Sequence, residues 1–154
     1  MCLTDLLTNE NDIDETNQSQ FTPSAYFDTE EFALLAKHHT NGFVSIFNSN
    51  ARSLLRHKVN YDTFFEYIFE KSKFSFDILC FEETWLSSEL ENLACFNSYE
   101  NIYRHKQPNK EGGGIAIFIK NYLKYNIRCD IIIPDNLIGL FDCIFIDLDI
   151  ENVK

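Results

Sequence analysis

The stretch FDILCFEETWL, residues 76–86, decides the expected fold, because an apolar run ends there in two carboxylates. Residues 76–80 have the composition of a buried β-strand, and Glu82 and Glu83 follow where that strand would leave the sheet. In α/β proteins, binding and catalytic groups gather outside the carboxyl ends of the strands. The sequence therefore predicts a candidate site at Glu82 and Glu83.

A second apolar run, residues 43–47, precedes the polar segment 48–54. Between the two runs, residues 53–73 carry apolar side chains at helical spacing. A strand, a crossover helix and a second strand is the simplest interpretation, and it makes the two strands parallel. Their carboxyl ends would then share one edge of the sheet, where Asn50 converges with the two glutamates.

The remaining elements are predicted from composition and turn residues. They are a short helix over 86–93, an extended segment over 97–104, a strand over 115–120 after three glycines, and apolar strand-like runs over 127–133 and 141–150 separated by a turn. Strands and helices of this order indicate an α/β protein, or more broadly an α+β sandwich.

The chain has 154 residues, 45% apolar and 15% aromatic, which suits one packed domain. Its net charge of −11 argues against a protein that simply coats nucleic acid. Residues 1–41 hold eight acids and one base, a net charge of −7, while residues 42–154 carry only −4. We therefore expect an acidic, largely disordered leader over 1–41, with a short helix near 29–37, and a folded domain over 42–154.

Five cysteines form no C-x-x-C pair and have no histidine at metal-finger spacing. Reduced thiols are the simplest interpretation, with Cys80 and Cys143 serving as small buried hydrophobes. The chain begins with neither a secretory signal pattern nor an apolar run long enough to span a bilayer. A soluble intracellular protein is the resulting expectation.

Asn50 and one of the two glutamates form a plausible partial ligand shell for Mg²⁺, which prefers oxygen donors and keeps several waters. The alternative is purely structural, since an Asn after a strand commonly forms a turn and a Glu commonly caps a helix or faces solvent. The glycines at 112–114 lack the G-K-[ST] ending of a phosphate loop, so a flexible hairpin entry is favoured.

Arg104 and Lys106, beside Tyr103, are candidates for contact with a nucleic-acid backbone, although a solvated loop explains them equally well. The histidines are scattered, and no Ser–His–Asp or Cys–His arrangement has support. They lie at positions 38, 39, 57 and 105.

Taken together, four blocks resemble the opening half of an endonuclease/exonuclease/phosphatase domain. The blocks are residues 43–54 with NSNARSL, residues 76–86 with FEETWL, Tyr99 with Arg104, and residues 112–120, GGGIAIFIK. The N-A-R-S-L and E-T-W-L forms are most similar to the apurinic/apyrimidinic-type endonuclease domains encoded by non-LTR retrotransposons. The resemblance covers about residues 26–150.

This resemblance implies a two-sheet α/β sandwich that cuts DNA phosphodiester bonds with the help of Mg²⁺. Carried over by position, Asn50 and Glu83 would lie at the metal and the scissile phosphate, and Arg104 would be a weaker substrate-binding candidate. Glu82 stands where the family more often has Ser, Thr or Gln, and Ser49 stands where it usually has an apolar residue. Glu82 therefore adds negative charge beside the expected phosphate.

The family's later motifs, G-D-x-N and S-D-H, do not occur in this sequence, so it lacks the general-base pair that they bring. A truncated endonuclease domain that is inactive alone is the first expectation, with an apolar sheet face or strand edge left open. The alternatives are a non-catalytic module that binds a protein through that open face, or an unused gene fragment. The family's role would imply a nuclear location, for which the sequence has no basic import cluster.

Overall fold

The computed structural model describes residues 25–38, 43–108, 111–134 and 140–149. This part is a mixed α/β protein with a four-stranded and a two-stranded sheet. Its elements are α1 (Thr29–His38), β1 (Ile46–Asn50), α2 (Leu54–Ser72), β2 (Ile78–Glu82), the 3₁₀ helix η2 (Glu91–Leu93), β3 (Tyr99–Arg104), β4 (Ile115–Lys120), β5 (Lys124–Ile127) and β6 (Ile146–Asp149). The predicted leader up to residue 24 lies outside the described residues.

The four-stranded sheet has the order β1-β2-β4-β3, and α2 connects its two parallel strands β1 and β2. Strand β4 pairs antiparallel with both β2 and β3. In the register of the parallel pair, Asn50 lies opposite Glu82. The strand–helix–strand unit predicted from the sequence is therefore confirmed, and both strands end at the same edge.

One face of this sheet packs against α2 through a cluster of aromatic side chains. Phe81 is fully buried, and its ring stacks on Phe96 at a centroid distance of 5.7 Å. Phe47 meets the α2 residue Phe65 edge to face at 5.0 Å. The apolar stripe of α2 covers this face because its aromatic residues recur at helical spacing, while α1 joins through the ring of Phe32 stacked on Phe76.

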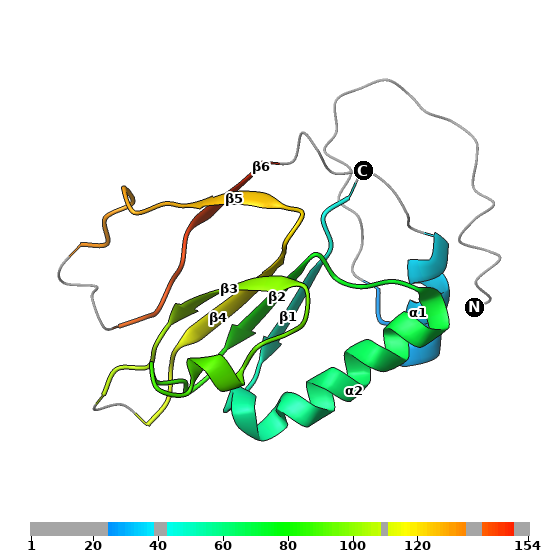
Figure 1. Ribbon diagram of the computed structural model, residues 1–154, viewed down its shortest axis with the longest axis horizontal. Coiled ribbons are helices and arrows are strands. Elements are labelled where there is room, and N and C mark those ends of the chain that lie inside the picture. The colour runs from blue at the N-terminus through cyan, green and yellow to red at the C-terminus, as the bar shows by residue number, and fades with distance from the viewer. Residues whose placement is uncertain (1–24, 39–42, 109–110, 135–139, 150–154) are drawn as a thin grey trace.

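The opposite face is covered by the β5–β6 pair, so the sheet lies between α2 and a second sheet (Figure 1). The buried sheet residues on this side are Ile78, Ile102, Ile117 and Ile119, packed against Tyr125, Ile144, Ile146 and Leu148. The apolar face expected to be open is therefore at least partly covered. Large apolar side chains remain exposed at the outer strand β1, where Ile46 is 57% exposed and the preceding Phe43 is 71% exposed.

The prediction of a strand over 127–133 is wrong. Strand β5 begins earlier, at Lys124, since Leu123 N–H closes a tight turn onto Lys120 O at 2.9 Å. Arg128 N–H still donates to Phe145 O at 2.9 Å, but Cys129 N–H then turns back onto Ile127 O at 3.1 Å, and the guanidinium of Arg128 binds Asp130. This local turn ends the strand although the residues that follow are apolar.

Two other predicted elements are shorter in the structure. The helix expected over 86–93 is reduced to η2, a single 3₁₀ turn. Among the described residues, only β6 of the strand expected over 141–150 is a strand, so Cys143 lies before it. Cys80 is within β2 as expected, and burial raises the pKa of its thiol. Both side chains are only partly buried, whereas full burial was expected.

Candidate functional site

The loops that follow β1 and β2 are joined to each other by backbone hydrogen bonds. Ala51 N–H donates to Glu82 O at 2.8 Å, and Ser53 N–H donates to Glu83 O at 2.9 Å. Helix α2 then starts with Leu54, whose N–H donates to Thr84 O at 3.0 Å. The backbone after Asn50 therefore runs beside the backbone of the two glutamates, as the parallel pairing predicts.

These two loops also contain most of the unusual backbone conformations. Among the described residues, six non-glycine residues have positive φ, and four of them are Arg52 (41°), Ser53 (82°), Glu83 (51°) and Trp85 (57°). Positive φ is unfavourable for residues with a Cβ, and such strain gathers at functional sites. The clustering supports a functional interpretation of the strand ends.

The carboxylate of Glu83 is held through one of its two oxygens. Oε2 accepts hydrogen bonds from Gly113 N–H at 2.8 Å and from Trp85 Nε1–H at 2.9 Å. These donors lower the pKa of Glu83, so the group is ionised at neutral pH. Among the described residues, both hydrogen bonds to this carboxylate are accepted by Oε2 and none by Oε1.

The glycines at 112–114 form the cradle of this carboxylate. A Cβ on Gly112 would lie 2.6 Å from Glu83 Oε2, too close for any other residue to fit without moving the carboxylate. Gly113 has φ of 93°, which glycine adopts easily. Gly113 O in turn accepts the backbone N–H of Trp85 at 3.0 Å. The sequence predicted a hairpin entry here, and its role in holding Glu83 was missed.

Asp142 is a further site residue that the sequence did not single out. Its Oδ2 accepts Gly114 N–H at 3.0 Å, and its Oδ1 accepts Nε–H of Arg104 at 3.1 Å. Its side chain is only 16% exposed. Asp142 precedes β6 and lies far from the other residues along the chain, so no local sequence pattern could have identified it.

Asn50, Glu82 and Arg104 lie in one row across the end of the sheet. Asn50 is opposite Glu82, Glu82 is opposite Ile115, and Ile115 is opposite Arg104. Residues directly opposite in a sheet share a face, so all three are on the same side. Asn50 and Arg104 are therefore in this row with the exposed Glu82, and Glu83 follows Glu82 directly after the end of β2.

The donor chemistry suits a hard cation that needs few protein ligands. Among the described residues, no three His, Cys, Asp or Glu side chains are grouped to hold a metal ion. Mg²⁺ commonly uses only one or two carboxylates and completes its shell with water and substrate phosphate. The Glu83 carboxylate and the Asn50 carboxamide at this edge are oxygen donors of the kind that Mg²⁺ uses.

The histidine nearest to this region in sequence is engaged elsewhere. His105 Nε2 lies 2.7 Å from Glu91 Oε2, and its ring stacks on Tyr103. These contacts of His105 give no support for a general base beside Glu83.

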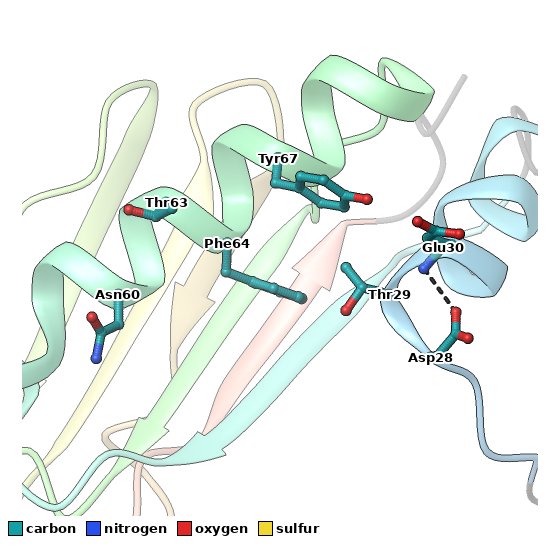
Figure 2. Close-up of a pocket in the computed structure, with 7 residues that line it drawn as sticks. All are labelled: Asp28, Thr29, Glu30, Asn60, Thr63, Phe64 and Tyr67. Carbon is teal, nitrogen blue, oxygen red and sulfur yellow. Dashed lines mark hydrogen bonds between the residues drawn. The ribbon is translucent and has the colours of Figure 1, made fainter.

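A separate groove of ≈ 640 Å³ lies between α1 and α2 (Figure 2). It is lined by Asp28, Thr29 and Glu30 from the start of α1 and by Asn60, Thr63, Phe64 and Tyr67 from α2. Asp28 is already engaged, since its Oδ1 accepts the N–H groups of Glu30 and Glu31 as a helix cap. The groove starts about 9 Å along α2 from its first residue, and it is not the site at the strand ends.

Comparison of the chain with protein-family models, with curated proteins and with solved structures returned no match in any of the three. Within the described residues, no helix has the length and apolar character needed to cross a membrane.

Proposed function

We propose that this chain carries the metal-binding part of a Mg²⁺-dependent DNA phosphodiesterase site of the endonuclease/exonuclease/phosphatase type, most similar to the endonuclease domains of non-LTR retrotransposons. The observation that carries the proposal is the Glu83 carboxylate, which is ionised and held through Oε2 with no hydrogen bond from a described residue to Oε1, directly after Glu82, the residue opposite Asn50. The β1–α2–β2 unit and the packing of a second sheet onto the first support the same proposal.

In this site, Glu83 and Asn50 would hold the cation, which when bound would polarise a phosphodiester and offset the charge of its transition state. Glu83 is suited to this because its charge is stabilised by two donors that also fix its direction. Arg104 lies in the row of residues across the sheet that also contains Asn50 and Glu82, and its side chain is partly exposed. Its guanidinium is therefore the candidate to donate hydrogen bonds to a phosphate.

The sequence lacks the motifs that bring the general base in the family it resembles. The motifs G-D-x-N and S-D-H do not occur in the sequence, and His105 pairs with Glu91. Activation of the attacking water and correct placement of the phosphate each contribute orders of magnitude to the rate. We therefore propose that residues 1–154 bind the cation but do not cleave DNA by themselves.

Calorimetric titration of the purified chain with Mn²⁺ or Mg²⁺ tests the cation site. We expect one binding event that Glu83→Gln abolishes and that Glu66→Gln, an exposed control on α2, leaves unchanged. Glu82→Gln shows which of the two neighbouring glutamates matters, because it removes one negative charge and leaves the hydrogen-bonded carboxylate of Glu83 in place. Equal binding by the wild type and Glu83→Gln would contradict the proposal.

Incubation with supercoiled plasmid and the same cations tests the absence of cleavage. We expect no nicking by the wild-type chain. Nicking that disappears in Glu83→Ala would show that the chain completes the reaction alone, and the statement about activity would then be wrong.

A protein-binding module is the second candidate, and the exposed apolar residues beside and on β1 favour it. Phe43 and Ile46 are largely exposed, and β1 is the outer strand of its sheet. Such an edge can pair with another chain. A pull-down with wild-type protein should then recover a stoichiometric complex that Ile46→Lys weakens. An unused gene fragment would give neither this complex nor the cation binding.

A further inference from the structure

Two consecutive backbone N–H groups of the glycine loop each hold a carboxylate from a different part of the chain. Gly113 N–H donates to Glu83 Oε2 at 2.8 Å, and Gly114 N–H donates to Asp142 Oδ2 at 3.0 Å. Both glycines have positive φ, so the loop adopts a conformation that non-glycine residues avoid. The direction of the Gly113 N–H therefore depends on the hydrogen bond that holds the next residue, Gly114, to Asp142.

We propose that Asp142 is a positioning residue for Glu83: it fixes the glycine loop through Gly114 and thereby sets the direction in which Glu83 presents Oε1. The cation that would use Oε1 belongs to the proposed function, and to that extent this inference rests on it. The coupling between Asp142 and Glu83 itself needs no metal.

The surroundings of Asp142 fit an anchor. Its carboxylate is bound on both oxygens, by Gly114 N–H and by Nε–H of Arg104, and the side chain is mostly buried. A Cβ on Gly113 would lie 3.0 Å from Asp142 Oδ2, so the carboxylate packs directly against the loop. A glycine loop has large conformational freedom, and contacts of this kind are needed to hold one conformation.

The negative charge of Asp142 disfavours the ionised form of Glu83. Its electrostatic effect and its geometric effect on Glu83 can therefore be told apart. Its negative charge raises the pKa of Glu83, opposing the larger effect of the two hydrogen bonds. A group that served Glu83 only by its charge would be positive. The contribution that the geometry assigns to Asp142 is its hydrogen bond to Gly114 N–H, while Arg104 compensates its charge.

Two substitutions separate geometry from charge. Asp142→Asn keeps the size and an acceptor oxygen for Gly114 N–H but removes the charge. Asp142→Glu keeps the charge but moves the carboxylate by one methylene. Asp147→Asn and Asp147→Glu are matched controls on β6, since Asp147 is exposed and its carboxylate binds Arg128, away from the glycine loop.

The first measurement is metal-free: it is the proton NMR resonance of the indole N–H of Trp85, the single tryptophan of the sequence, which donates to Glu83 Oε2. If Asp142 positions the loop, Asp142→Glu shifts this resonance because the Gly113 N–H and the Glu83 carboxylate move together, and Asp142→Asn leaves it near its wild-type position. If only charge matters, Asp142→Glu gives the wild-type resonance, and the inference is overturned. Circular dichroism and thermal melting confirm that each variant is folded.

The second measurement is the Mn²⁺ titration. Changing a residue that orients a metal ligand typically weakens metal binding by 10–100-fold, so we expect Asp142→Glu to bind Mn²⁺ about tenfold more weakly. Asp142→Asn should stay within about threefold of the wild type, as should the Asp147 controls. The reverse order would overturn the inference. If the wild type itself binds no Mn²⁺, the proposed function fails, and the indole N–H resonance of Trp85 alone decides the role of Asp142.

Discussion

Trp85 donates its indole N–H to Oε2 of Glu83 over 2.9 Å, and both residues have positive φ in the loop that follows β2. The same oxygen accepts Gly113 N–H, so the tryptophan and the glycine loop hold the carboxylate together. Because Trp85 is the only tryptophan of the chain, its fluorescence and its indole proton report directly on Glu83.

Acidification should break this pair at a pH below the ordinary pKa of a glutamate. The pKa of Glu83 is lowered from 4.5, so the hydrogen bonds stabilise the folded state above that pH and are lost as the pH falls through the lowered pKa. We expect a change in Trp85 fluorescence over this acid range that is absent in Glu83→Gln. A midpoint above pH 4.5 would contradict the structure.

Gly112→Ala should displace the Glu83 carboxylate while leaving the protein folded. The new Cβ would lie 2.6 Å from Glu83 Oε2 and 3.3 Å from Trp85 Nε1, and the end of the glutamate side chain can move to relieve the contact. Proton NMR of the indole N–H should show an upfield shift as its hydrogen bond is lost. An unchanged indole resonance would mean that the loop has room for a methyl group.

Thr84→Val should stabilise the protein. Thr84 is 1% exposed, and its Oγ1 is buried with no hydrogen-bond partner among the described residues. A buried hydroxyl without a partner costs about 1–3 kcal/mol, and valine has the same shape without that group. We expect an increase of about 1 kcal/mol in the free energy of unfolding, measured with urea.

Thr63→Val is the matched control for this experiment. Thr63 is exposed on α2, and its hydroxyl donates to Val59 O at 2.9 Å. The control should change stability by less than about 0.5 kcal/mol. A loss of stability in Thr84→Val would show that the hydroxyl has a partner after all.

Asp77→Ala should destabilise the junction between β1 and β2. Asp77 Oδ2 accepts both N–H and O–H of Ser45 at 2.6 Å, and Oδ1 accepts O–H of Tyr122. Removing the carboxylate leaves these donors without an acceptor at a position where Asp77 is only 9% exposed. We expect the free energy of unfolding to fall by about 2–3 kcal/mol. Asp62→Ala is the control, because its ion pair with Lys58 is partly exposed and should contribute less than about 1 kcal/mol.

Four tyrosines should ionise late in an alkaline titration followed by absorbance. Burial raises the pKa of Tyr103 to about 12 and raises the pKa of Tyr99 further. Partial burial together with the carboxylate that its hydroxyl binds raises the pKa of Tyr122, beside Asp77, to about 12 and also raises the pKa of Tyr125, beside Glu100. Since the unfolded chain loses these protons near pH 10, stability should fall as the pH rises from about 10 towards 12. Tyr99→Phe should remove one late transition, and seven tyrosines that titrate together would contradict the packing.

The order of residues was enough to predict the β1–α2–β2 unit and the shared edge of Asn50 and Glu83. Both rest on regularities within a short stretch of chain: apolar runs for the strands, helical spacing between them, and the crossover helix that makes such strands parallel. The end of β5 was not predictable in this way, since the apolar residues after Ile127 leave the sheet where Arg128 binds Asp130. The pattern of apolar residues predicts which side chains are buried, but the end of this strand is set by turn contacts that the pattern does not contain.

The environment of Glu83 was decided only by the tertiary structure. Its donor Gly113 lies 30 residues away, and Asp142 lies a further 28 residues from the adjacent Gly114. Spacing along the chain indicated that a carboxylate ends β2, yet it carried no information on which oxygen is held or which remains available. Hydrogen-bond geometry depends on atoms brought together by packing from both sheets, and for that reason the loop and Asp142 became visible only in the folded chain.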